Sequence, residues 1–341
     1  MKVLFIDSTS TPYHGGSMGE KALGGIETAT VELSRHLARL GHAVAVANAV
    51  AAPVEVAGVR WMPRAQARGE TADVVIVNND PRLFDEAPGA FRAGARAVTW
   101  LHNRLRVEKT IRKGHMGAFL RYRPEVVFVG DLHRRDTSRL HPFRRRIVIP
   151  LGVSGDFLAA PPLPAEPPPP PCAIFTSQAY RGLNDMIGLW IDRIRPAVPG
   201  AEFHVYTGKP EPVRGAEEIA AAGIVLHPRV AKPELVAALR ASRVMLYPGH
   251  KDETFCLAAA EALCLGLPVA TRGIGSLRER VRDGIDGLIA PDLDRLAEGV
   301  IAILRDDGLW TRLHAGAVAR RADSGWDAVA QAWDAQVLRR R

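Results

Sequence analysis

Residues 253–261 read Glu-Thr-Phe-Cys-Leu-Ala-Ala-Ala-Glu, and the next four residues are Ala, Leu, Cys and Leu. This apolar run predicts a helix that follows a strand at Val244–Tyr247. The helical neighbours of Glu261, one turn away in each direction, are all apolar: Leu257, Ala258, Cys264 and Leu265. We therefore expect the carboxylate of Glu261 on a buried face.

A buried carboxylate is costly unless it finds donors or an opposite charge. Two partners stay open for Glu261: adjacent hydroxyls of a bound sugar, or an arginine from elsewhere in the core. Glu253 also has two interpretations. It is either a first-turn acid that stabilises the helix dipole, or a residue beside backbone amides that bind an anionic group.

Short apolar segments alternate with helices on both sides of this stretch. One helix is predicted from about Gly25 to Leu40, because its apolar residues recur at helical spacing and Gly41 follows. The predicted strands are Val3–Ile6, Ala43–Ala47, Val74–Val77, Ala97–Leu101, Val126–Val129, Ile147–Ile149, Ala173–Thr176, Phe203–Tyr206, Ile224–Leu226, Val244–Tyr247, Val269–Thr271 and Leu288–Ala290. The alternation predicts an α/β fold with parallel sheets covered on both faces. Two such domains would hold a ligand between the carboxyl ends of their strands.

A proline-rich stretch divides the chain. Residues 161–171 read Pro-Pro-Leu-Pro-Ala-Glu followed by five prolines. Because proline lacks the amide donor and fixes φ, this stretch predicts an extended linker between a domain at 1–160 and one at 172–325. A ligand for a proline-binding domain is the alternative.

Composition narrows the class of protein. The chain has 341 residues and three cysteines without a CxxC pair, so it predicts buried reduced thiols and neither disulfides nor a zinc site. It has no apolar run long enough to span a membrane, and the run near its N-terminus ends at Asp7, too early for a signal peptide. We therefore expect a cytoplasmic protein. A nicotinamide-dependent enzyme is disfavoured, because no G-x-G-x-x-G follows the first strand.

The net charge of +8 is concentrated in one segment. Residues 104–146 hold 13 basic and 4 acidic side chains. One interpretation is an arginine-rich solvated surface; the other is contact with an anionic membrane face or a phosphate-bearing acceptor. Nucleic-acid binding is weaker, because no recognised motif accompanies the charge. The candidate contacts are Arg104, Arg106, Lys109, Arg112 and Lys113.

Residues 253–261 also resemble the E-x7-E motif of family 4 retaining glycosyltransferases (glycosyl transferases group 1). Further likenesses are Gly24-Gly25-Ile26-Glu27, Thr99-Trp100-Leu101-His102, Ile149-Pro150-Leu151-Gly152-Val153, Gly266-Leu267-Pro268-Val269, Gly273-Ile274-Gly275-Ser276 and Asp283-Gly284-Ile285-Asp286-Gly287. They preserve the order and spacing of that family over most of the chain.

The resemblance implies a GT-B fold, with two Rossmann-like domains facing each other across a cleft. It implies that a final amphipathic helix at about 326–341 packs back on the first domain. Glu253 and His102 would contact the reacting sugar. The donor-binding residues it implies are Glu261, Arg181, Thr254, Phe255, Cys256, Leu257, Gly24, Gly25 and Val230, with Glu261 on the ribose hydroxyls.

Two positions depart from the family pattern. Thr254 stands where the family has a glycine, so its side chain is expected to narrow the sugar pocket. Gln178 occupies the place of a first phosphate-binding arginine, which makes Lys209 a candidate replacement.

The resemblance implies a retaining hexosyltransferase that uses a nucleotide-sugar donor and needs neither cofactor nor metal. We expect a glycan or lipid-linked acceptor, a role in cell-surface polysaccharide or glycolipid assembly, and peripheral contact with the inner face of the plasma membrane. The alternatives are a nucleotide-sugar binding protein without transferase activity and a transferase for a small soluble acceptor.

Overall fold

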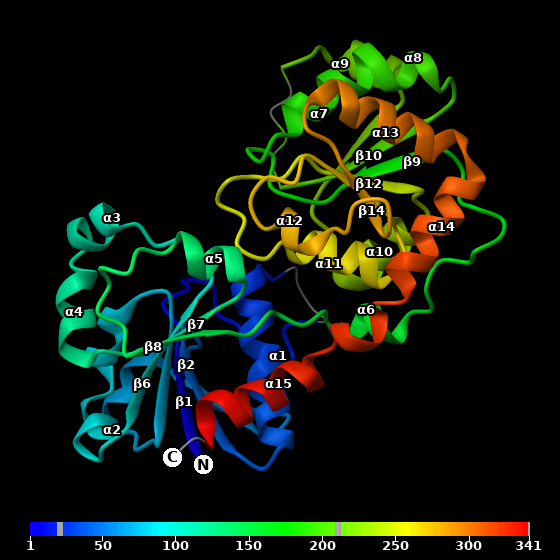
Figure 1. Cartoon of the computed structure of the whole chain (residues 1–341). Helices are drawn as coiled ribbons and strands as arrows, with labels where there is room; N and C mark the ends of the chain where they lie inside the picture. The colour runs from blue at the N-terminus through cyan, green and yellow to red at the C-terminus, as the bar shows by residue number, and fades with distance from the viewer. Residues whose placement is uncertain (19–22, 209, 211–212, 340–341) are drawn as a thin grey trace. The chain divides into compact units, whose positions relative to one another are not determined.

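The computed structural model describes residues 1–18, 23–208, 210 and 213–339 (Figure 1). Its contacts divide the chain into two compact units. The first unit is Met1–Gly152 together with Trp326–Arg341, and the second is Val153–Gly325.

The first unit is built on an eight-stranded sheet with the order β3-β4-β2-β1-β5-β6-β7-β8. All neighbouring strands pair in parallel except β3 and β4, which form an antiparallel hairpin at one edge. The sequence patterns missed this hairpin. The strands are β1 (Lys2–Ile6), β2 (Ala43–Asn48), β3 (Val54–Val56), β4 (Val59–Pro63), β5 (Val74–Asn78), β6 (Arg96–Leu101), β7 (Glu125–Phe128) and β8 (Arg145–Val148).

Helices cover both faces of this sheet, with α1 and α15 on one side and α2, α3 and α4 on the other (Figure 1). Burial on both faces explains why β1 and β5 are almost wholly apolar. The helices of this unit are α1 (Gly25–Arg39), α2 (Pro88–Arg92), α3 (Val107–Arg112), α4 (His115–Tyr122), α5 (Asp131–Asp136) and α15 (Trp326–Trp333), with short 3-10 turns at Arg64–Gly69 and Pro81–Glu86 and a π-helical turn at Asp334–Leu338.

The last helix, α15, returns to the first unit and completes its core. The ring centroid of Trp333 lies 5.1 Å from that of Trp100 in β6, edge to face, and that of Trp326 lies 6.5 Å away. Both tryptophans of α15 are buried. His42, just before β2, adds a hydrogen bond between its Nε2 and an Asp334 carboxylate oxygen at 2.9 Å.

The second unit contains a six-stranded parallel sheet with the order β11-β10-β9-β12-β13-β14. Its strands agree with the sequence predictions to within one or two residues. They are β9 (Cys172–Phe175), β10 (Glu202–Tyr206), β11 (Ile224–His227), β12 (Val244–Leu246), β13 (Val269–Thr271) and β14 (Gly287–Ile289).

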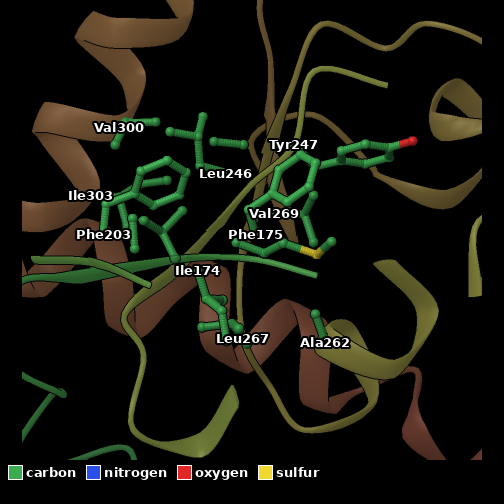
Figure 2. Close-up of a cluster of buried hydrophobic side chains, with 14 of the residues drawn as sticks. Ile174, Phe175, Phe203, Leu246, Tyr247, Ala262, Leu267, Val269, Val300 and Ile303 are labelled. Carbon is green, nitrogen blue, oxygen red and sulfur yellow. The ribbon is translucent and has the colours of Figure 1, made fainter. Parts of the chain in front are cut away.

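The core of the second unit lies on both sides of this sheet. In Figure 2, Val300 and Ile303 of the helix α13 lie on one side of Ile174, and Leu267 and Ala262 lie on the other. The helices are α6 (Gly155–Ala159), α7 (Leu183–Leu189), α8 (Arg195–Ala197), α9 (Ala216–Ala221), α10 (Lys232–Arg240), α11 (Leu257–Cys264), α12 (Leu277–Arg280), α13 (Leu293–Arg305) and α14 (Asp307–Val318), with a π-helical turn at Trp190–Ile194 and a 3-10 turn at Arg321–Ser324.

The proline-rich stretch lies inside the second unit, so the boundary predicted at 161–171 was wrong. The units divide at Gly152 instead. Leu163 is buried in the second core, and its N–H donates to the carbonyl of Leu265 at 2.8 Å. The carbonyl of Pro169 accepts from Arg243 Nη1 at 3.2 Å. The segment is extended, as proline requires, but it packs on its own unit.

No helix within the described ranges is long and apolar enough to cross a membrane.

We expect Trp333→Ala to lower the free energy of unfolding of the first unit by about 3–5 kcal/mol, because it leaves a large cavity beside Trp100. Urea unfolding followed by circular dichroism measures the loss. Gln331→Ala, at an exposed position of the same helix, is the matched control and should change stability by less than about 0.5 kcal/mol. Equal stability of the two variants would contradict the role given to α15.

Candidate functional site

The loops that follow β9, β12 and β13 pack closely at the carboxyl end of the second sheet. Gly182 has a φ of 94°, and a Cβ there would lie 2.8 Å from Cγ of Pro248. Gly249 has a φ of 88°, and its Cβ would lie 2.6 Å from the carbonyl oxygen of Ile274. Glycine is needed at both positions, because another residue would be strained and would collide with the neighbouring loop. The three loops therefore form one surface.

Arg181 and Glu253 meet on this surface. They come from the loops after the adjacent strands β9 and β12, and they form an ion pair through Arg181 Nη1 and Glu253 Oε1. The Glu253 side chain is 6% exposed. Its backbone is fixed too: its N–H donates to the His250 carbonyl at 2.9 Å, and its carbonyl accepts from Ser276 N–H at 3.1 Å. Two residues that the sequence singled out separately are thus brought into contact.

The start of α11 lies directly after this pair. Phe255 and Cys256 are buried, and Leu257 is the first residue of the helix. Cys256, the residue before α11, has a φ of 66° and is left-handed, whereas Thr254, where the resemblance expects glycine, is not among the residues with positive φ. Burial raises the pKa of the Cys256 thiol to about 12, so the thiol is neutral at physiological pH.

Glu261 lies on α11 with its side chain 14% exposed. Its partner is Lys232 at the start of α10, with Nζ 3.8 Å from Glu261 Oε1. The sequence analysis left open an arginine of the core as the partner of Glu261. The structure has a lysine in that role. Burial raises the pKa of Glu261, and the positive charge of Lys232 opposes that shift. Val230 is half-buried two residues before Lys232, in the loop after β11.

Sequence reasoning missed two cations of this unit. Lys232 faces Glu261, and Arg280 lies with its Cζ 4.4 Å from the ring centroid of Phe255. Burial lowers the pKa of Arg280. No local pattern signals either contact, because each joins two segments that are separate in the chain. Lys209, the expected replacement cation, lies outside the described residues.

In the first unit, Gly24, Gly25 and His102 follow the carboxyl ends of β1 and β6. Gly24 caps α1, and the Glu27 carboxylate lies against it where a Cβ would collide. The His102 backbone N–H donates to Asn79 Oδ1 at 2.8 Å, and its ring centroid is 4.4 Å from that of Trp100. Burial lowers the pKa of His102 to about 3, so the ring is neutral.

The basic residues of the first unit differ in exposure. Arg104 is half-buried and pairs with Asp136 at 2.7 Å, so its charge is partly neutralised within the fold. Arg106 is exposed and precedes α3. Lys109, Arg112 and Lys113 are exposed along α3 and just after it.

In the part of the chain that the structure describes, no group of three or more His, Cys, Asp and Glu side chains is arranged to hold a metal ion.

Residues 171–306 match a family described as Glycosyl transferases group 1. Most of the second unit, residues 153–325, lies within this match. The match contains Arg181, Glu253 and Glu261, so the Arg181–Glu253 ion pair and the helix α11 lie within the matched segment.

Curated relatives extend the likeness. The chain is 31% identical over 232 residues to a D-inositol 3-phosphate glycosyltransferase of Xylanimonas cellulosilytica, which covers 62% of this chain and 54% of that protein. It is 39% identical over 106 residues to a D-inositol 3-phosphate glycosyltransferase of Frankia alni, covering 30% of this chain and 26% of that protein. The chain thus matches about half of the first relative's length and about a quarter of the second's.

Solved glycosyltransferase-type structures resemble this chain over both of its units. Sucrose-phosphate synthase of Thermosynechococcus elongatus superposes with a TM-score of 0.73 at 17% identity, covering 97% of this chain and 96% of that chain. Anabaena HepE in complex with UDP and glucose gives a TM-score of 0.71 at 14% identity, covering all of both chains. The fold is therefore GT-B, with a Rossmann-like parallel sheet in each unit, as the sequence predicted.

Two buried histidines make the stability of the first unit depend on pH. Burial lowers the pKa of His102 to about 3 and that of His133 to about 4. The unfolded chain binds protons on these rings near the usual pKa of about 6.5. The stability of the unit is therefore unaffected by them above about pH 6.5 and falls as the pH drops toward 4.

We expect His102→Asn to reduce the slope of unfolding free energy against pH by about 1.4 kcal/mol per pH unit near pH 5, because one proton fewer is taken up on unfolding. Urea unfolding of the wild type and the variant at half-unit pH steps from 4.5 to 8 measures both slopes. Parallel curves would show that His102 is not held neutral by burial.

Proposed function

We propose that the chain is a glycosyltransferase that moves a sugar from a nucleotide-sugar donor to an acceptor hydroxyl. The observation that carries the proposal is the Arg181–Glu253 pair beside the start of α11, within the segment that matches the family. Relatives are named for glycosyl transfer, and a structure of similar fold is HepE in complex with UDP-glucose.

In this proposal the donor binds to the second unit at the carboxyl ends of β9 and β12. Arg181 and the amides of Phe255, Cys256 and Leu257 hold the diphosphate, because a guanidinium and helix-start amides both favour anionic oxygens. Glu253 and Thr254 contact the sugar. Glu261 accepts hydrogen bonds from the ribose hydroxyls, and the base lies along the backbone near Val230.

Residues of the first unit complete the reaction. Gly24 and Gly25 let the backbone approach the phosphates, and His102 contacts the transferring sugar. The neutral state of His102 suits it to donate or accept a hydrogen bond without adding charge.

The transfer proposed here retains configuration at a hexose-type sugar. The bond from the anomeric carbon to the phosphate oxygen breaks, the acceptor oxygen bonds to the same face, and the departing phosphate takes the acceptor proton. Charge develops on the diphosphate, and Arg181 with the amides of α11 stabilises it without a metal ion.

Two acceptor classes fit the basic first unit. One is a growing glycan or lipid-linked acceptor in cell-surface polysaccharide or glycolipid assembly. The other is a small phosphate-bearing alcohol, and the names of the relatives favour it. A phosphate-bearing lipid-linked acceptor and a small phosphate-bearing alcohol are both anionic, which matches the charge of residues 104–146. A cytoplasmic location belongs to the same proposal.

We expect Glu261→Ala to weaken binding of the preferred nucleotide sugar by about 1.5–3 kcal/mol, roughly 10- to 150-fold, because a charged hydrogen bond to ribose is lost. Calorimetry with UDP-, GDP-, ADP- and dTDP-sugars identifies the donor first. Glu217→Ala, which removes an exposed carboxylate of the same unit, should leave affinity unchanged. If Glu261→Ala binds as tightly as the wild type, Glu261 serves only the ion pair with Lys232.

We expect Arg181→Ala to discriminate between ligands that differ only in phosphate. Affinity for the preferred nucleoside diphosphate should fall about 10- to 150-fold, the loss of a charge-assisted hydrogen bond, and affinity for its nucleoside should not change. An equal loss for both ligands would mean that Arg181 acts through Glu253 and the loop rather than on the diphosphate.

Turnover separates the transferase from a protein that only binds nucleotide sugars. We expect release of nucleoside diphosphate with each acceptor glycosylated, at a rate that a chelator does not change. Donor binding with no turnover on lipid-linked and small phosphate-bearing acceptors would favour the binding protein.

A further inference from the structure

Lys232 occupies a position that does not favour a lysine locally. It is the first residue of α10, where the helix dipole favours a carboxylate over a cation. Its side chain is only 15% exposed, although lysine is among the residues least often buried. The ring of Phe157 in α6, with its centroid 5.5 Å from Nζ, offsets part of this cost. The carboxylate of Glu261 is the other group that compensates the charge.

The contact between Lys232 and Glu261 is an ion pair and not a hydrogen bond. Nζ lies 3.8 Å from Oε1, which is beyond the range of an N–H···O hydrogen bond. In the part of the chain that the structure describes, no group donates a hydrogen bond to the carboxylate of Glu261. Lys232 therefore supplies an opposite charge and leaves the lone pairs of the carboxylate to a ligand.

Burial and two charges of opposite sign set the protonation of Glu261. Burial raises its pKa, the positive charge of Lys232 lowers it, and the negative charge of Asp156 in α6 raises it. The thiols of Cys256 and Cys264 are neutral at physiological pH, because burial raises their pKa values to about 12 and about 11. Lys232 is the cation that opposes protonation of the carboxylate.

Other basic residues around α11 make their contacts elsewhere. Arg280 of α12 lies over an aromatic ring, and His314 of α14 and Arg321 each bond to a backbone carbonyl. The elements that carry these three residues all pack against α11. Removal of Lys232 would therefore leave Glu261 without a compensating cation among the described residues.

We propose that Lys232 is a positioning residue for nucleotide binding, whose charge keeps Glu261 a carboxylate with both oxygens free to accept hydrogen bonds from two ribose hydroxyls. This inference rests on the proposed contact of Glu261 with ribose. An ionised carboxylate only accepts hydrogen bonds, whereas a protonated one places an O–H where a lone pair is needed. The pair therefore selects a ribonucleotide over its 2′-deoxy analogue.

Calorimetry over a range of pH tests this role. The probe is whichever of UDP, GDP and ADP the wild type binds most tightly, together with its 2′-deoxy analogue. Relative to the wild type, we expect Lys232→Met to bind the ribonucleotide nearly as well at about pH 9 and at least about tenfold more weakly at about pH 6, because Glu261 is then protonated. Its preference for the ribonucleotide should disappear over the same range. A loss by the same factor at every pH would show a merely structural role and overturn the proposal.

Two further variants separate charge from shape. Lys232→Arg keeps the positive charge and should follow the wild-type dependence on pH. Arg305→Met removes an exposed cation of the same unit and should match the wild type at every pH.

Stability without ligand separates this inference from the proposed function. In Lys232→Met the folded state holds a proton on Glu261 that the unfolded chain releases, so stability falls as the pH rises. We expect the deficit of Lys232→Met against the wild type in urea unfolding to grow from about pH 5 to about pH 8, and to be constant in a Glu261→Gln background. A constant deficit in both backgrounds would overturn this inference alone. A growing deficit with no change in nucleotide binding would overturn the ribose contact on which the inference rests.

Discussion

A parallel sheet has to be covered by helices on both faces, because its strands are apolar on both sides and its connections cross over. This constraint organises each unit of the chain. Every crossover brings the polypeptide back to the same edge of the sheet, so the loops after successive strands gather there. Polar residues that are far apart in sequence, such as Arg181 and Glu253, become neighbours for this reason alone.

Close packing of these loops sets the geometry of the candidate site. Gly182 and Gly249 allow the chain segments to approach one another at distances that a Cβ would prevent. The charged groups are then held in pairs, Arg181 with Glu253 and Lys232 with Glu261. Each carboxylate is largely withdrawn from water and compensated by a cation, which keeps the cost of burial low. A bound ligand would add donors to carboxylates that are already fixed in place.

The sequence predicted most of this architecture because apolar periodicity is a local signal. The six strands of the second sheet follow from it directly. The β3–β4 hairpin did not, since its strands are short and partly exposed at a sheet edge. The extended conformation of the proline-rich stretch was predicted correctly, because it follows from the local sequence. Its place as a linker between the units was predicted wrongly, because that depends on contacts with distant residues. Contacts of Leu163 and Pro169 with the second unit decided the matter.

In the candidate site, too, the features set by local sequence were predicted and those set by distant contacts were not. The motif at 253–261 places Glu261 on a helix, and the structure has it there. The expectation that Glu253 opens this helix was wrong, because the helix begins at Leu257 and Glu253 lies in the loop before it. The identity of the Glu261 partner could not be predicted, because Lys232 lies 29 residues before it and is brought close only by the fold, in which α10 and α11 both contact α6. The left-handed backbone of Cys256 was also unpredictable, since a cysteine gives no sign of it.

The return of α15 to the first unit has a consequence for biosynthesis. Residues 153–325 are contiguous, so this unit has all of its core once the ribosome has released that stretch. The N-terminal sheet has to wait longer for its full core, because Trp326 and Trp333 are made only after residues 153–325. Translation therefore inverts the usual order, and the N-terminal sheet lacks part of its cover until the second unit has been made.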